Sequence, residues 1–128
     1  MKFNEFVTSG KPNEADNYLG LLMASASYFH SAHFETKSYS RHKAYDNFFS
    51  NIPALTDSFG ETWLGFSGKK YSPAIPAQKD LPPDTIKMLD HIISESERIY
   101  ETMPGAIKNI IDEINALCYQ TKYLLSLD

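Results

Sequence analysis

Apolar side chains recur in this sequence every three or four residues, and no stretch alternates with the two-residue period of a β-strand. Such spacing places the apolar residues on one side of an α-helix. The pattern is long over residues 13–36, where the polar residues Asn13 and Glu14 precede about six helical turns. We therefore expect an amphipathic helix there, with an apolar stripe made of Ala15, Leu19, Leu22, Ala26, Phe29 and His33.

Three further helices are expected from the same spacing. The second covers residues 39–64, and Pro53 inside it either bends the helix or divides it into two pieces, because proline removes a backbone hydrogen bond. Residues 65–83 contain two glycines and four prolines, which indicates a connector. Asp84 is expected to cap the third helix. The Pro104–Gly105 pair separates it from a fourth helix that continues to the C-terminus.

Together these elements predict an all-α fold. Two helical hairpins with short turns, joined by one long crossover, have the connectivity of a ferritin-like four-helix bundle. The chain has 128 residues, which is the usual length of one domain. We expect a single helical-bundle domain over residues 1–128, with 65–83 as its crossover connector.

Charge and composition exclude several classes of protein. The net charge of −4 and the pI near 5.5 do not support DNA binding through phosphates, and Lys2 and Lys11 make no lysine-rich tail. No segment reaches the roughly 18 apolar residues of a membrane span, and the start of the chain lacks a secretory leader pattern. We expect a cytoplasmic protein without a membrane partner. The single cysteine, Cys118, is expected to be a small buried hydrophobe.

Side chains of metal-ligand type gather in the first two helices. His42 and Asp46 are one helical turn apart, and so are Asp57 and Glu61. The eleven residues from Asp46 to Asp57 make about three turns, so these four side chains line one stripe. The candidate metal ligands are His30, His33, His42, Asp46, Asp57 and Glu61.

One ion cannot reach the whole stripe within a single helix, because His42 and Glu61 are about 28 Å apart along it. An antiparallel second copy solves this problem by placing the His42 end of one chain beside the Glu61 end of the other. Imidazole and carboxylate ligands suit Fe(II), Zn(II) or Mn(II), and Fe(II) is the natural candidate for redox chemistry. The stripe thus predicts a homodimer with two equivalent metal sites between subunits.

The spacing His-x11-His-x3-Asp-x10-Asp-x3-Glu, filled by His30, His42, Asp46, Asp57 and Glu61, resembles the inter-subunit site of Dps proteins, the mini-ferritins. The segment HFETKSYSRHKAYDNFF is also similar to short Dps-like proteins encoded by bacteriophages. In that comparison His33 replaces His30 as the ligand from the first helix, and the sequence does not choose between them. The resemblance covers roughly residues 13–66.

The resemblance implies a concrete function. Dps-like proteins bind Fe(II) at dimer interfaces, oxidise it and store the ferric mineral, often in a hollow dodecameric cage, which protects against oxidative damage. Carried over, the imidazoles of one chain and the carboxylates of Asp57 and Glu61 from its neighbour would hold the iron, with Asp46 beside them. The implied activity is that of a ferroxidase, with no catalytic residues apart from the metal ligands.

Several features depart from that pattern. Pro53 lies where the two helices would cross, and no Glu-x-x-His motif supports a metal site inside the bundle. An alternative interpretation is a non-enzymatic oligomeric protein of structural or binding function. In such a protein the site either holds a static Zn(II) ion or is vestigial. Such a protein would be viral and act in the host cytoplasm.

Overall fold

The fold is all-α in the computed structural model, which describes residues 10–128. Four helices pack as a bundle, and residues 10–128 contain no β-strand, so the predicted fold class is confirmed. The first nine residues, which include Lys2 and most of the N-terminal segment that lacks a leader pattern, lie outside the described residues. The elements are α2 (Glu14–Glu35), α3 (Tyr39–Ser67), the 3-10 turn η1 (Gln78–Asp80), α4 (Thr85–Tyr100) and α5 (Gly105–Leu125).

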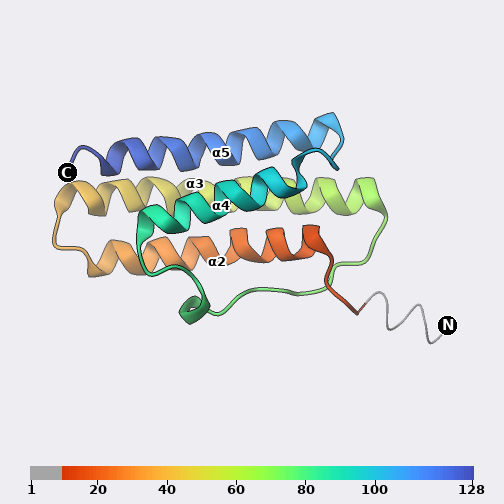
Figure 1. Ribbon diagram of the computed structural model, residues 1–128, viewed down its shortest axis with the longest axis horizontal. Coiled ribbons are helices and arrows are strands. Elements are labelled where there is room, and N and C mark those ends of the chain that lie inside the picture. Colours follow the sequence, from red (N-terminus) through yellow and green to blue (C-terminus); the bar gives the residue numbers. More distant parts are fainter. Residues whose placement is uncertain (1–9) are drawn as a thin grey trace.

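The bundle has α2 and α5 on opposite sides, with α3 and α4 between them (Figure 1). Helix α3 packs against both α2 and α5, and α4 packs against the same two helices from the other side. The connector that follows α3 runs along α2 and returns the chain to the start of α4. No helix in residues 10–128 is both long and apolar enough to cross a membrane.

Helix α2 begins at a capping box. The Asn13 side chain accepts a hydrogen bond from the Asp16 backbone N–H at 2.8 Å, and the Asp16 carboxylate accepts one from the Asn13 N–H at 3.1 Å. Gly20 in this helix lies against the connector, and a Cβ at this position would overlap the Ala74 carbonyl. The absence of a side chain at Gly20 therefore lets the connector lie directly on α2.

Helix α3 is one continuous helix of 29 residues, so Pro53 does not divide it. Pro53 is exposed, and on that side of a helix water can satisfy the carbonyl that loses its hydrogen bond. The helix is capped by the Ser38 side chain and ends at Gly68, whose φ of 67° is left-handed. It therefore continues past Leu64, and the predicted start of the connector at residue 65 is wrong by three residues.

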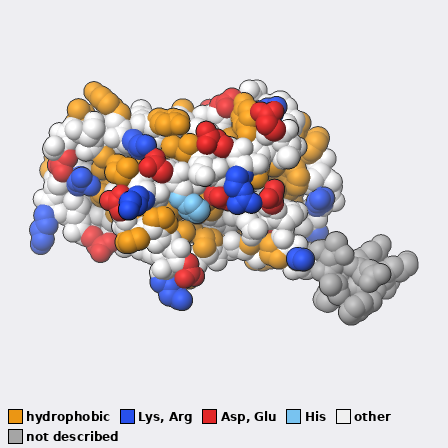
Figure 2. Space-filling model, in the orientation of Figure 1, with side chains coloured by type: hydrophobic (Ala, Val, Ile, Leu, Met, Phe, Trp, Pro, Cys, Tyr) orange, Lys and Arg blue, Asp and Glu red, His pale blue; other side chains and the backbone are white. Residues whose placement is uncertain are grey.

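The core lies where the four helices meet. Phe29, Phe48 and Phe59 are fully buried there, together with isoleucines from α4 and α5. Cys118 is also fully buried, as expected, and burial raises the pKa of its thiol to about 12. The face shown in Figure 2, with α4 toward the viewer, intersperses basic and acidic side chains. It offers no patch of a single charge to a strongly charged partner.

Candidate interaction and metal-ligand surface

Two histidines join the last turn of α2 to the first turn of α3. His33 donates from Nδ1 to the His42 carbonyl at 3.0 Å, and His42 donates from Nδ1 to the His33 carbonyl at 2.9 Å. Carbonyl oxygens only accept, so both Nδ1 atoms carry a proton in this arrangement. The rings stack with their centroids 3.6 Å apart and their planes at 20°. In neutral rings this leaves both Nε2 atoms as the nitrogens able to bind a metal ion.

Aromatic rings extend this pair across the outer surface of α2 and α3. His30 stacks on Phe49, with centroids 4.1 Å apart, and on Phe34, with centroids 5.1 Å apart. Phe49 also meets the ring of His33 edge-on at 5.0 Å. Phe34 is 75% exposed. We call these five residues, His30, His33, Phe34, His42 and Phe49, the hairpin-end cluster.

The structure thus pairs His33 with His42 and places His30 in an aromatic stack. The two histidines of α2 still lie near each other, with ring centroids 5.9 Å apart. Asp46 follows His42 by one turn and accepts a hydrogen bond from Ser50 at 3.3 Å. Four of the six predicted ligands therefore lie at one end of the α2–α3 hairpin.

Asp57 and Glu61 lie toward the other end of α3. Both are exposed, and neither has a hydrogen bond or an ion pair within residues 10–128. They stand at a hollow of about 250 Å³ between α2 and α3, lined mainly by apolar side chains. The hollow is lined by Leu19, Met23, Thr56, Asp57, Gly60, Glu61, Leu64 and Tyr71.

A single chain does not assemble the six predicted ligands. Among the described residues, no three His, Cys, Asp or Glu side chains converge on a point that would hold a metal ion. The reason is length, since His42 and Glu61 are separated by about 28 Å of straight helix. The intermolecular site predicted from the sequence remains a prediction.

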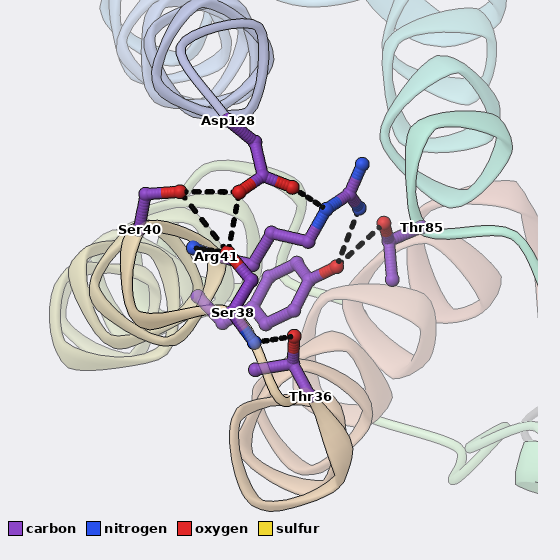
Figure 3. A network of polar contacts seen from close by, with 7 residues as sticks. Thr36, Ser38, Ser40, Arg41, Thr85 and Asp128 are labelled. Carbon is purple, nitrogen blue, oxygen red and sulfur yellow. Dashed lines mark hydrogen bonds and ion pairs between the residues drawn. The ribbon is translucent and has the colours of Figure 1, made fainter.

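A polar network next to this hairpin was not expected from the sequence (Figure 3). The Asp128 carboxylate accepts hydrogen bonds from Ser38, from Ser40 at 2.7 Å and from Arg41 at 2.8 Å. These bonds hold the pKa of Asp128 down, at about 2. Arg41 also donates to the Tyr45 hydroxyl at 3.3 Å. The network ties Asp128, three residues after the end of α5, to the start of α3, which no local spacing pattern signals.

A cleft of about 610 Å³ lies beside that network. Arg41 and Lys79 line it, but so does the carboxylate of Glu35. Charges of both signs therefore oppose each other, and the cleft has no clear preference for an anionic ligand.

The sequence places this helical bundle in a family. Residues 33–125, which contain His33, α3, α4 and α5, match the model of DUF5856, described as a family of unknown function. The chain belongs to this family. The matched range covers α3, α4 and α5, so the DUF5856 assignment rests on the sequence of three helices and not on a few ligand positions.

A relative in Enterobacteria phage T4 is similar over the full length. It is the uncharacterized 14.6 kDa protein in the mobD-ri intergenic region, 62% identical over 128 residues, with all of both chains covered. This agrees with the expected likeness to a phage protein. No solved structure matches the chain.

The resemblance to Dps proteins is wrong. The match to DUF5856 and the T4 relative place the chain in a family to which neither comparison gives a Dps or ferritin assignment. Ferroxidase activity, mineral storage and the dodecameric cage were implied by that resemblance alone, so they lose their basis. The side chains that suggested it are present, but their helical spacing is also an ordinary consequence of a polar stripe on an amphipathic helix.

Proposed function

We propose that this protein is a non-enzymatic, homo-oligomeric binding protein, with a dimer as its smallest unit. The surface that associates is the outer face of the α2–α3 hairpin. The observation that carries the proposal is the hairpin-end cluster, in which Phe34 is 75% exposed beside half-buried Phe49 and His33. Aromatic side chains are enriched at protein interfaces, and a surface aromatic cluster is favourable to bury.

A second candidate function is the binding of a divalent transition metal ion between two subunits. It is favoured by the two Nδ1–carbonyl bonds, which fix His33 and His42 in the manner of metal-ligating histidines. A second copy would add the unpaired carboxylates of Asp57 and Glu61, with Asp46 and His30 nearby. This donor set suits Fe(II), with Zn(II) or Mn(II) as alternatives. The proposed place of action is the cytoplasm of the phage host.

The oligomeric state is measured first, by light scattering on a sizing column and by sedimentation over a range of micromolar concentrations. We expect a dimer or a larger assembly without added metal. A monomer throughout that range would contradict the proposed self-association.

Metal binding is then measured by calorimetry with Zn(II), and with Fe(II) under anaerobic conditions. His42→Gln and Glu61→Gln are expected to weaken binding at least tenfold, while His91→Gln on α4 leaves it unchanged. Equal binding by all three variants would contradict the metal site and leave the self-association untouched. Exposure of the Fe(II)-loaded protein to peroxide, followed by ferric absorbance, shows whether bound iron is also oxidised.

A further inference from the structure

We propose that two copies pack their outer α2–α3 faces antiparallel about a two-fold axis at Ser50, with Phe34 of each copy seated in the hollow of the other. This inference rests on the proposed self-association and specifies its partner and register. Three features of the described residues place the axis.

The first feature is a protruding ring and a hollow on the same face. Phe34 projects from the end of α2 and is 75% exposed. The hollow of about 250 Å³ lies farther along the same pair of helices, and Leu19, Met23 and Leu64 give it apolar walls. Gly60 contributes only backbone atoms to its lining. Burying a phenyl ring against such walls removes apolar surface from water on both copies.

The second feature is the level of these two elements along the bundle. Phe29 meets Phe48 at 4.4 Å and Tyr18 meets Phe59 at 5.0 Å, so α2 and α3 run antiparallel. Phe34 therefore lies beside the His42 end of α3, and the centre of the hollow lies at about the level of Ser58. A two-fold axis that brings Phe34 of one copy to the hollow of the other passes α3 halfway between these two levels, at Ser50.

The third feature is charge. Lys43 and Asp57 lie seven residues before and after Ser50, so all three share one side of α3, with about 20° between successive members. Lys43 and Asp57 are both exposed, and neither has an ion-pair partner in residues 10–128. An axis at Ser50 places Lys43 of one copy opposite Asp57 of the other, twice. One axis at Ser50 therefore accommodates both the apolar and the charged features.

The surface at the axis is suited to close approach. Ser50 lies between Phe48 and Ile52, which are fully buried, so it points away from the core. Its neighbours on this side include exposed Pro53, and both side chains are small. The axis lies in the plane between the two copies and is perpendicular to the helices. In this arrangement α3 packs on α3 of the second copy, and α2 packs on α2.

A cysteine at the axis tests the register. Ser50→Cys is expected to form a disulfide-linked dimer under mild oxidation, because the two Cβ atoms meet across the axis. Ser94→Cys, an exposed serine on α4, is the matched control and is expected to remain unlinked. Buried Cys118 does not compete. A dimer by light scattering in which Ser50→Cys does not link would overturn the register and leave the proposed function standing, whereas a monomer would overturn both.

A charge exchange tests the facing pair. Lys43→Glu and Asp57→Lys are each expected to weaken the dimer at least tenfold, and the double variant is expected to regain most of that loss. Additive losses in the double variant would overturn the facing of these two residues. The measurement is the dimer dissociation constant at low ionic strength, where surface charges are least screened.

Truncation of the ring tests the hollow. Phe34→Ala is expected to raise the dimer dissociation constant at least tenfold. Phe66→Ala, a second exposed phenylalanine outside the hollow, is expected to leave it unchanged. An unchanged constant for Phe34→Ala would overturn the seating of the ring, while the Ser50 cross-link reports the axis independently.

Discussion

At the scale of single residues, the buried hydroxyl pair of Tyr18 and Ser96 links α2 to α4 through the core. The two oxygens are 2.6 Å apart, and Ser96 donates its proton to the Ile92 carbonyl at 2.9 Å. Tyr18 must therefore be the donor in the shared bond. Burial raises the pKa of the Tyr18 phenol, so it stays protonated over the physiological range. This bond satisfies a polar group that would otherwise be stranded among apolar side chains.

Removal of the acceptor is expected to destabilise the fold. Ser96→Ala leaves the Tyr18 hydroxyl buried without a partner, which costs about 1–3 kcal/mol in the free energy of unfolding. Tyr18→Phe removes the donor, so the double variant should lose less than the sum of the two single variants. Urea denaturation of all four proteins measures this coupling. Strict additivity would show that the two hydroxyls do not depend on each other.

At the candidate site, hydrogen bonds within the His33–His42 pair likewise satisfy polar side chains. His33 lies on the apolar stripe predicted for α2, where a histidine is more often a satisfied structural residue than a ligand. The structure explains its place by hydrogen bonds to and from the partner histidine. This bonding fits either a structural pair or a pair of metal ligands. Calorimetry with Zn(II) and Fe(II) distinguishes the two roles.

At the scale of secondary-structure elements, the connector and α2 depend on one glycine. Glycine inside a helix normally costs about 0.5–1 kcal/mol relative to alanine. At Gly20 a Cβ would overlap the Ala74 carbonyl of the connector. Gly65, near the end of α3, has no neighbouring atom within 4 Å of the same position. Both glycines lie inside helices, but only Gly20 has another segment of the described chain packed against it.

Alanine at these positions is expected to act in opposite directions. Gly65→Ala should raise the free energy of unfolding by up to about 1 kcal/mol, because helix propensity improves and nothing clashes. Gly20→Ala should lower it by about 1–3 kcal/mol, because the connector backbone must shift. Thermal and urea unfolding measure both. A stabilised Gly20→Ala would mean that the connector does not rest on α2.

At the scale of the whole molecule, Asp128, three residues after the end of α5, joins that end of the helix to the beginning of α3. Its carboxylate accepts from Ser38, Ser40 and Arg41, and these contacts explain its lowered pKa of about 2 (Figure 3). The group is exposed, so solvent screening keeps its contribution to stability small. It nevertheless couples two segments of the chain that are 87 to 90 residues apart in sequence.

This contact is expected to depend on pH. The pKa is lower in the folded state than the ordinary value of 3.8, so the stabilisation is complete above pH 3.8 and is lost as the pH falls toward about 2. Asp128→Asn should lower the melting temperature by a few degrees at neutral pH, and the difference from the original protein should vanish in strong acid. Asp80→Asn, whose carboxylate has only a 3.8 Å contact with Lys79, is the control. A difference that persists unchanged in acid would contradict the role of the ionised carboxylate.

How much the sequence revealed differs between the fold and the site. The helices and the bundle followed from apolar spacing and from caps at Asn13 and Asp84, because the hydrophobic effect acts on a periodic pattern. The effect of Pro53 did not follow, because it depends on which side of α3 faces solvent. The Dps resemblance failed because a handful of polar positions at helical spacing is weak evidence of ancestry, whereas the DUF5856 match spans three helices.

The sequence by itself determined the α-helical character, the two hairpins and the six candidate ligands on the first hairpin. Only the tertiary structure decided that His33 faces His42, that Phe34 projects into solvent, and that a hollow opens beside Gly60. Helical periodicity reports neighbours within about four residues, and these features join residues from different helices. The physical reason is that side-chain spacing sets which face of a helix is apolar, while packing against other helices sets what each polar or aromatic side chain meets.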